Sequence, residues 1–341
     1  MKLSIIVPVY NMAENNKLDF CIKSLLAQTF QDYEIIVVDD KSTDDSLEVL
    51  KQYKKKYPDK IKVIASSNNR RAGGAKNLGL RAASGEWLGF VDCKDWISPD
   101  CYEKLFLKAE ETGADIVGCN HCIKSTQDFE PGEVSESHYA NLNGNMTEDK
   151  YREVILWPEN MVTKIYKHSI FYDNGIWFSE YMFYEDNSAG VLSMLYCKRY
   201  AHVDETLYYC YENSASMEQC ANIRKCNDSL KSMEMLLAEC YKRGFLEEYP
   251  EELEYRFTEK FYINTLFMYM HQVPFFKRRA SYVRLIRDGI MAYYPEYASN
   301  GYFEERQDAE TKRLVEMHCK SPFRFFWYYT VLMICRKLRK R

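Results

Sequence analysis

The sequence predicts an α/β fold with a mostly parallel central sheet, followed by a helical C-terminal extension. Three observations support this prediction. Over the first 122 of the 341 residues, short apolar runs typical of buried strands alternate with amphipathic helical segments. The connections between them are short, as in parallel sheets that helices cover on both faces. From about residue 217 the pattern becomes helical and rich in charged residues.

The expected strands are apolar runs bounded by polar or turn-forming residues. They are LSIIVPV (3–9), EIIVVDD (34–40), KVIAS (62–66), EWLGFVDCKD (86–95) and ADIVGCN (114–120). Helical segments separate them, and these lie at 15–28, 44–57, 73–83 and 99–112. Each strand is thus followed by a helix, except that the last leads into a different kind of sequence.

The strand–helix alternation ends near residue 122. Residues 123–150 are polar and are predicted to form a loop or hairpin, and residues 151–212 are mixed and rich in aromatic side chains. We therefore divide the chain into three parts. These are residues 1–122, 123–216 and 217–341.

Composition excludes several classes of protein. The chain has 46 basic and 50 acidic residues, and a net charge of −4 argues against nucleic-acid binding, which requires a basic surface. Its 12 cysteines are expected to be reduced, because the chain does not open with a secretory leader. No apolar run reaches the ~18 residues of a membrane-spanning helix. We expect a cytoplasmic protein.

Polar residues follow three of the predicted strands. They occur in Pro8-Val9-Tyr10-Asn11, in Asp39-Asp40 and in Asp92-Cys93-Lys94-Asp95. Ligands of open parallel sheets bind at the carboxyl ends of the strands, so these groups can hold a sugar-bearing nucleotide. A carboxylate can accept a hydrogen bond from a base or a ribose, and a pair can hold a divalent ion on a diphosphate. The alternative is that these acids only cap helices or lie in turns.

These segments also carry a family resemblance. VPVYN, VVDDKSTDDS, NRRAGGAKNLGL and GEWLGFVDCKDW occur in the order and spacing of the family 2 glycosyltransferases with the GT-A fold, and the sequence resembles that family over residues 1–216. YEDN (184–187) and LYYCYENSAS (207–216) extend the likeness. The resemblance implies a GT-A domain made of a nucleotide-sugar-binding half, 1–122, and an acceptor-side half, 123–216.

The resemblance implies transfer of a sugar from a nucleotide-activated donor, most often a UDP-sugar, with inversion at the anomeric carbon. The acceptor would be a glycan or a lipid-linked glycan of a bacterial surface polysaccharide. The donor would bind at Pro8, Tyr10, Glu14, Asp39, Asp40, Lys76, Asn77, Asp92 and Lys94. Asp186, preceded by Glu185, would be the catalytic base, and Trp157 and Lys164 would lie on the acceptor side.

Two positions depart from the family pattern. Lys94 stands where the family has the aspartate that binds the metal, and Tyr211 replaces a usual arginine. A divalent ion, Mn²⁺ or Mg²⁺, would have to be held by Asp92 and Asp95 next to a lysine that repels it. Lys94 therefore also favours an alternative, a catalytically silent relative that binds nucleotide or glycan and supports a partner enzyme. A nucleotidyltransferase is disfavoured, because no Gly-rich phosphate loop follows the first strand.

The chain ends in an aromatic and basic segment, residues 322–341. Eleven nearly apolar residues, Phe325 to Cys335, precede Arg336, Lys337, Arg339, Lys340 and Arg341. One prediction is a helix lying on an anionic membrane surface, which would place the protein peripherally on the inner face of the membrane. The alternative is a terminal helix packed into the core, with a solvated basic end.

Overall fold

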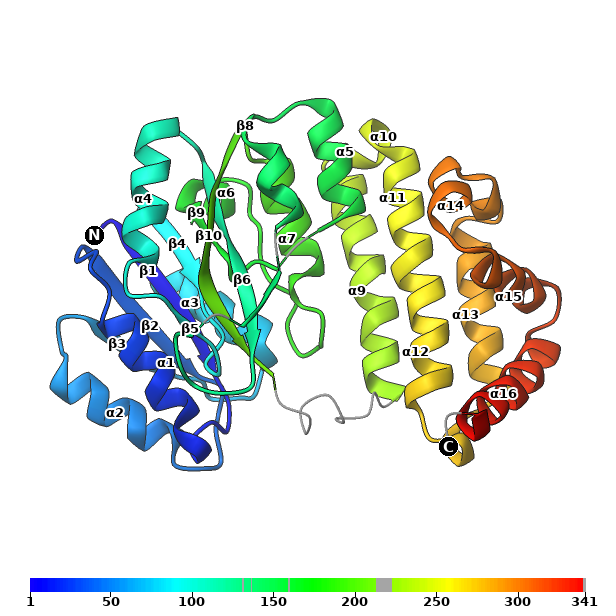
Figure 1. The fold of residues 1–341 in the computed structure, drawn as a ribbon, viewed down its shortest axis with the longest axis horizontal. Coiled ribbons are helices and arrows are strands. Elements are labelled where there is room, and N and C mark those ends of the chain that lie inside the picture. The colour runs from blue at the N-terminus through cyan, green and yellow to red at the C-terminus, as the bar shows by residue number, and fades with distance from the viewer. Residues whose placement is uncertain (131, 136, 159, 213–222, 340–341) are drawn as a thin grey trace. The chain divides into compact units, whose positions relative to one another are not determined.

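The computed structural model describes residues 1–130, 132–135, 137–158, 160–212 and 223–339, with side chains up to Arg336. Two compact units make up the chain, one before and one after residues 213–222 (Figure 1). The last part of the predicted motif LYYCYENSAS, residues 213–216, lies outside the described residues.

The first unit is built on one mixed sheet with the strand order β3-β2-β1-β4-β9-β6-β10-β5. Its longer strands are β1 (Leu3–Val9), β2 (Tyr33–Asp39), β3 (Ile61–Ala65), β4 (Trp87–Phe90), β6 (Ile116–Lys124), β9 (Lys164–Lys167) and β10 (Arg199–Tyr211). Three short strands, β5 (Trp96–Ile97), β7 (Glu133–Ser135) and β8 (Gly144–Asn145), pair antiparallel at β10 and β6.

All the longer strands except β9 run in one direction. β3, β2, β1 and β4 pair parallel, and so do β6 and β10. β9 lies between β4 and β6 and is antiparallel to both, so that β4 and β6 share a direction. The predicted mostly parallel sheet is confirmed, and the carboxyl ends of these strands meet along one edge.

Helices cover both faces of the sheet. They are α1 (Lys17–Leu26), α2 (Ser46–Lys56), α3 (Arg71–Ala82), α4 (Cys101–Thr112), α5 (Glu148–Leu156), α6 (His168–Tyr172) and α7 (Asp186–Leu195), with the short turns η1 (Glu14–Asn16) and η2 (His138–Leu142). The main core packs α1, α2 and α4 against one face through residues such as Leu25, Leu50 and Leu105. On the other face, Ala75 of α3 packs on Ile36 and Val38 of β2. Both faces are apolar, which explains the continuous apolar strands in the sequence.

The sequence places one strand incorrectly. The predicted strand 86–95 ends at Phe90, and a tight turn separates β4 from β5. The backbone N–H of Asp95 donates to the carbonyl of Asp92 at 2.9 Å and closes this turn. The four polar or small residues from Asp92 to Asp95 thus break the strand, whereas residues 114–120 continue to Lys124 because β10 and β7 pair with β6 on both sides.

The second unit is helical, as predicted. Its elements are α9 (Ile223–Lys242), α10 (Phe245–Glu248), α11 (Pro250–Phe257), the π-helical η3 (Thr258–Asn264), α12 (Thr265–Gln272), η4 (Phe275–Lys277), α13 (Ala280–Tyr293), η5 (Tyr297–Ser299), α14 (Gly301–Arg306), α15 (Ala309–Lys320) and α16 (Pro322–Arg339). α9, α12 and α13 stand side by side (Figure 1). No helix in the described ranges is long and apolar enough to cross a membrane.

The terminal helix α16 has two different faces. Phe325, Phe326 and Tyr329 are buried, and the Tyr329 hydroxyl lies 2.7 Å from His271 Nε2 of α12. Phe323, Trp327, Val331 and Ile334 are exposed, and their spacing of three or four residues places them on one side of the helix. The basic side chains after Arg336 lie outside the described residues.

Candidate active site

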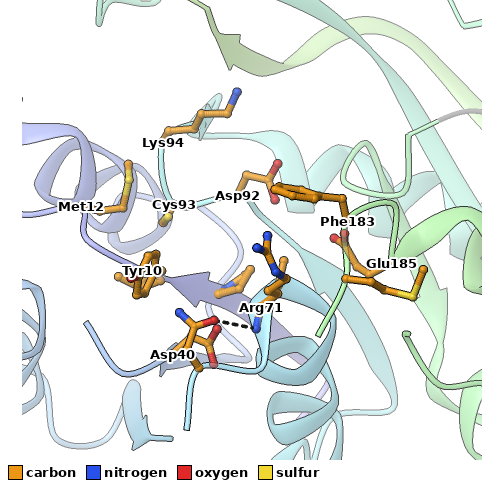
Figure 2. Close-up of a pocket in the computed structure, with 14 residues that line it drawn as sticks. Tyr10, Met12, Asp40, Arg71, Asp92, Cys93, Lys94, Phe183 and Glu185 are labelled. Atoms are coloured by element: carbon orange, nitrogen blue, oxygen red, sulfur yellow. Dashed lines mark hydrogen bonds between the residues drawn. The ribbon is translucent and has the colours of Figure 1, made fainter. Parts of the chain in front are cut away.

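A cavity of about 480 Å³ opens at the carboxyl-terminal edge of the sheet (Figure 2). The residues that line it come from the end of β1 and the loop after it, the end of β2, the start of α3 and the loop before it, the turn after β4 and the loop before α7. They are Pro8, Val9, Tyr10, Met12, Asp40, Asn69, Arg71, Ala72, Asp92, Cys93, Lys94, Met182, Phe183 and Glu185. The predicted residues Pro8, Tyr10, Asp40, Asp92, Lys94 and Glu185 are therefore brought together.

The loop after β1 presents Tyr10 to this cavity, and the residue is 48% exposed. Backbone N–H groups of this loop donate to the side chains of the segment after β2. The three bonds are Asn11 to Ser42 Oγ at 3.0 Å, Met12 to Ser46 Oγ at 2.7 Å and Ala13 to Asp44 Oδ2 at 3.0 Å. The polar residues of KSTDDS thus position the Tyr10 loop, a role that sequence reasoning missed.

Two buried aspartates end β2, and each has an oxygen without a hydrogen-bond partner among the described residues. Asp39 Oδ2 accepts from the Ser42 N–H at 3.2 Å, and Asp40 Oδ1 accepts from the Arg70 N–H at 2.8 Å. Asp39 Oδ1 and Asp40 Oδ2 have no such partner. Only Asp40 lines the cavity. Burial raises the pKa of Asp40, against the hydrogen bond from the backbone N–H of Arg70.

The predicted catalytic acids stand at the start of α7, opposite a buried lysine. Lys76 Nζ lies 2.8 Å from Glu185 Oε1, and the two side chains are only 4% and 16% exposed. Burial alone would raise the pKa of Glu185, but the Lys76 ammonium lowers it below the usual value. Burial and the Glu185 carboxylate raise the pKa of Asp186, against the same lysine. The pKa values of these two adjacent acids are thus shifted in opposite directions, which is the pattern of an acid–base site.

Lys76 and Asn77 hold the loop before α7 and do not line the cavity. Asn77 Nδ2 donates to the Phe178 carbonyl at 2.9 Å and to Glu180 Oε1 at 3.0 Å, and its Oδ1 accepts from the Phe178 N–H at 2.9 Å. Gly73 lets α3 approach this loop closely, because a Cβ there would lie 2.0 Å from the Ser179 carbonyl oxygen. In this structure both predicted donor-binding residues position the loop before α7, and their contact with a donor stays a prediction.

The turn after β4 separates the roles of its two aspartates. Asp92 lines the cavity, whereas Asp95 is buried and does not. Asp95 Oδ2 accepts from the Tyr208 hydroxyl at 2.9 Å and its Oδ1 from the Tyr211 N–H at 2.8 Å. Burial and Asp92 raise the pKa of Asp95 to about 7. Asp95 therefore joins this turn to the end of β10.

This donor set does not fit a divalent ion held by the turn. Asp92 is its only carboxylate on the cavity, Asp95 is already hydrogen-bonded through both oxygens, and the Lys94 ammonium lies 4.0 Å from Asp95 Oδ1. Across the described ranges, no three His, Cys, Asp or Glu side chains gather in a group that could hold a metal ion.

Arg71 and Phe183 are cavity residues that sequence reasoning did not single out. The Arg71 guanidinium stacks 4.0 Å from the centre of the Phe183 ring, so that the first residue of α3 meets the loop before α7 across the cavity (Figure 2). The segment NRRAGG contained the signal, since an arginine beside a Gly-rich helix start is a common anion-binding arrangement.

Three other predicted residues lie elsewhere. Glu14 is exposed at the start of η1 and does not line the cavity. Trp157 is exposed after α5, with its ring 6.0 Å from that of His138. Lys164 is buried, and its Nζ donates to the Asn160 carbonyl at 2.8 Å. Neither Trp157 nor Lys164 lines the cavity, and their acceptor role stays a prediction.

Comparison with known proteins identifies the family. A model of the glycosyl transferase family 2 matches residues 4–183, more than half of the chain. The chain belongs to glycosyl transferase family 2. The matched range of this family 2 chain contains every cavity residue except Glu185.

Named relatives agree with this assignment. The chain is 32% identical over 221 residues to the uncharacterized glycosyltransferase EpsJ of Bacillus subtilis, and 29% identical over 227 residues to the uncharacterized glycosyltransferase YibD of Escherichia coli. Each match covers 64% of this chain and 63% of the relative, so the likeness spans less than two thirds of either relative.

A solved structure shows the same fold. The crystal structure of S. aureus TarS 1-349 in complex with UDP-GlcNAc matches with a TM-score of 0.72 and 21% identity, covering 97% of this chain and 90% of that one. The predicted GT-A fold with a helical extension is thereby confirmed.

Proposed function

We propose that this family 2 chain is an inverting glycosyltransferase that moves a sugar from a UDP-sugar to a hydroxyl of a glycan acceptor in surface polysaccharide synthesis. One observation carries the proposal. A single cavity presents Asp40, with an unpaired carboxylate oxygen, and Glu185, which adjoins Asp186. The proposed nucleotide-binding acid and the first residue of the Glu185–Asp186 pair thus line the same cavity, whereas Asp186 itself, the next residue, does not line it.

The nucleotide would bind between Tyr10 and Asp40. The exposed Tyr10 ring offers a face for stacking a base, and Asp40 Oδ2 can accept the N–H of a uracil. Since a buried acceptor without a partner is costly, a ligand N–H at this position gains a charge-assisted hydrogen bond. The UDP-GlcNAc bound to TarS supports a uridine nucleotide as the donor's leaving group.

Asp186 would act as the general base. The acceptor hydroxyl attacks the anomeric carbon on the face opposite the nucleotide, and a carboxylate takes its proton as the new bond forms. A raised pKa suits Asp186 to this role, while Glu185 stays ionised beside Lys76. Two relatives are named for poly(ribitol-phosphate), the beta-glucosyltransferase of Bacillus spizizenii and the beta-N-acetylglucosaminyltransferase TarS of Staphylococcus aureus, and they support a polyol or glycan acceptor.

The test measures binding and turnover separately. Calorimetry of the full chain with UDP, GDP and CDP is expected to show the tightest binding for UDP, and a panel of UDP-sugars is expected to yield UDP release with one of them. Asp186→Asn should reduce turnover by roughly 10²- to 10⁴-fold with little change in UDP affinity. UDP binding without turnover on any donor would instead support the silent relative that Lys94 favours.

We also propose that the protein works at the cytoplasmic face of a membrane, where a lipid-linked acceptor would be. The exposed face of α16 contains Phe323, Trp327, Val331 and Ile334. Phe275 and Phe276 are exposed on η4, which Arg278 joins to α16 through a 3.9 Å contact with Met333. Aromatic side chains flanked by basic residues favour the interface of an anionic bilayer.

Co-sedimentation with vesicles tests this surface. The full chain should bind vesicles that contain phosphatidylserine, and Trp327→Gln with Phe323→Gln should weaken that binding. Trp157→Gln, which removes an exposed tryptophan of the other unit, is the matched control. Equal sedimentation of all three proteins would contradict the membrane proposal and leave the transferase proposal intact.

A further inference from the structure

Two cationic side chains line the cavity from different walls. Lys94 extends from the turn between β4 and β5, and Arg71 begins α3 (Figure 2). Neither belongs to the Lys76–Glu185 ion pair that holds the loop before α7. The cavity therefore contains positive charge that the acid–base site does not use.

Lys94 is positioned by the end of β10. Its Nζ donates to the Tyr211 carbonyl at 3.1 Å, and 41% of its side chain is exposed. An ammonium group carries three N–H donors, so the bond to Tyr211 orients the group and still leaves donors for an anion. The same Tyr211 donates its N–H to Asp95, whose Oδ1 lies 4.0 Å from the Lys94 ammonium, beyond hydrogen-bond distance.

Arg71 is held in a different manner. Its backbone has a φ of 60°, and its guanidinium stacks on the Phe183 ring. A guanidinium placed over a ring keeps its N–H donors in its own plane, where they can bind phosphate oxygens in pairs. Lys94 supplies a point charge and Arg71 a planar fork, two complementary ways of binding a diphosphate.

We propose that Lys94 and Arg71 together neutralise the diphosphate of the donor, in place of a divalent ion. The proposal rests on the proposed function, because it assumes a nucleoside diphosphate in this cavity. The two residues bring two formal positive charges, as many as one divalent ion. An aspartate with a bound divalent ion has a net charge of +1, which is also the charge of a lysine. Lys94 therefore preserves the local charge without a metal.

The experiment compares UDP and UMP binding by calorimetry, each with EDTA and with excess Mn²⁺. Wild-type UDP affinity should change by less than about twofold between the two conditions. Lys94→Met should weaken UDP binding by about tenfold or more in both conditions, with little effect on UMP, because the lost contact is to the second phosphate. Lys51→Met on the exposed face of α2 is the control for loss of a lysine.

Lys94→Asp gives the decisive comparison. It restores a carboxylate beside Asp92, so UDP binding should fall in EDTA and recover with Mn²⁺. A wild-type protein whose UDP binding collapses in EDTA and returns with Mn²⁺ overturns the proposal, and so does a Lys94→Met variant with the normal preference for UDP over UMP. In both cases uridine nucleotides bind and the proposed function stands. Binding of neither UMP nor UDP overturns both.

Discussion

The buried ion pair between Lys76 and Glu185 makes a quantitative prediction. Replacing the lysine by methionine keeps most of the side-chain volume but leaves the Glu185 carboxylate, 16% exposed, without its cation. Removing one partner of a buried pair costs about 3–5 kcal/mol, and the partial exposure of Glu185 places the expected loss at roughly 2–4 kcal/mol at pH 7. For a domain of this size the loss corresponds to a fall in melting temperature of roughly 5–12 °C.

The pH dependence distinguishes the ion pair from simple packing. Lys76 lowers the pKa of Glu185 below its usual 4.5, so the pair contributes stability above that pH and loses it as pH falls through the folded-state pKa. Glu185, Asp92 and Asp186 overcome burial and raise the pKa of Lys76 above 10.5, so its contribution persists through neutral pH and is lost only as pH rises through the folded value. In Lys76→Met the isolated Glu185 takes up a proton more readily, and the loss should shrink from pH 8 to pH 5.

Thermal unfolding of the full chain measures both effects. Lys76→Met with Glu185→Gln should recover much of the lost stability, because no uncompensated charge remains. Lys51→Met, which breaks an exposed pair with Glu48, should change stability by less than about 0.5 kcal/mol. A loss below about 1 kcal/mol, or one that stays constant between pH 5 and 8, would refute the reasoning.

Two further predictions concern the cavity and the loop that carries its acids. Asp40→Asn should weaken UDP binding by roughly 1.5–3 kcal/mol, the range for a hydrogen bond to a charged group, and calorimetry showing unchanged affinity would place the nucleotide elsewhere. Gly73→Ala should reduce turnover by about tenfold or more and lower the melting temperature, because its Cβ would lie 2.0 Å from the Ser179 carbonyl oxygen and 2.9 Å from Glu185 Cβ. Gly190→Ala, whose Cβ would make ordinary contacts with Met161, is the matched control and should be neutral or slightly stabilising.

The sequence was sufficient for the parts of the fold that depend on local pattern. Apolar runs located β1, β2, β3 and β6, and the polar residues after the strands located Tyr10, Asp40 and Asp92 on one cavity. Both signals are contiguous in the chain, and the carboxyl ends of parallel strands necessarily meet at one edge. Periodicity also identified the helical extension, because amphipathic spacing is local too.

Contacts between distant segments could not be predicted in this way. The position of Asp95 in the motif predicts a metal ligand. Tyr208 and Tyr211, more than a hundred residues later, instead donate hydrogen bonds to both of its carboxylate oxygens. The position of Lys76 predicts a residue that binds the sugar donor, but in the structure its ammonium forms an ion pair with Glu185, 109 positions away. No rule of spacing indicates which distant group a buried charge will meet, and these partners decide whether a residue binds ligand or supports a loop.

Backbone conformation gives a further reason to treat the walls of the cavity as one preorganised unit. Asn11, Lys41, Arg71, Tyr181 and Tyr184 have left-handed φ values of 52–63°, and each lines the cavity or adjoins a residue that does. Such conformations cost about 1–2 kcal/mol each, so neighbouring bonds must hold them. The Tyr181 N–H donates to the Arg70 carbonyl at 2.8 Å, and Arg70 in turn pairs with Glu180 at 3.4 Å. Arg70 is also the hydrogen-bond partner of Asp40 and precedes Arg71. These bonds therefore join the start of α3 to the loop that leads to Glu185 and Asp186. The walls of the proposed nucleotide site and the Glu185–Asp186 pair are thereby held in one frame. For this reason a change at Gly73 or Lys76, neither of which lines the cavity, should alter turnover.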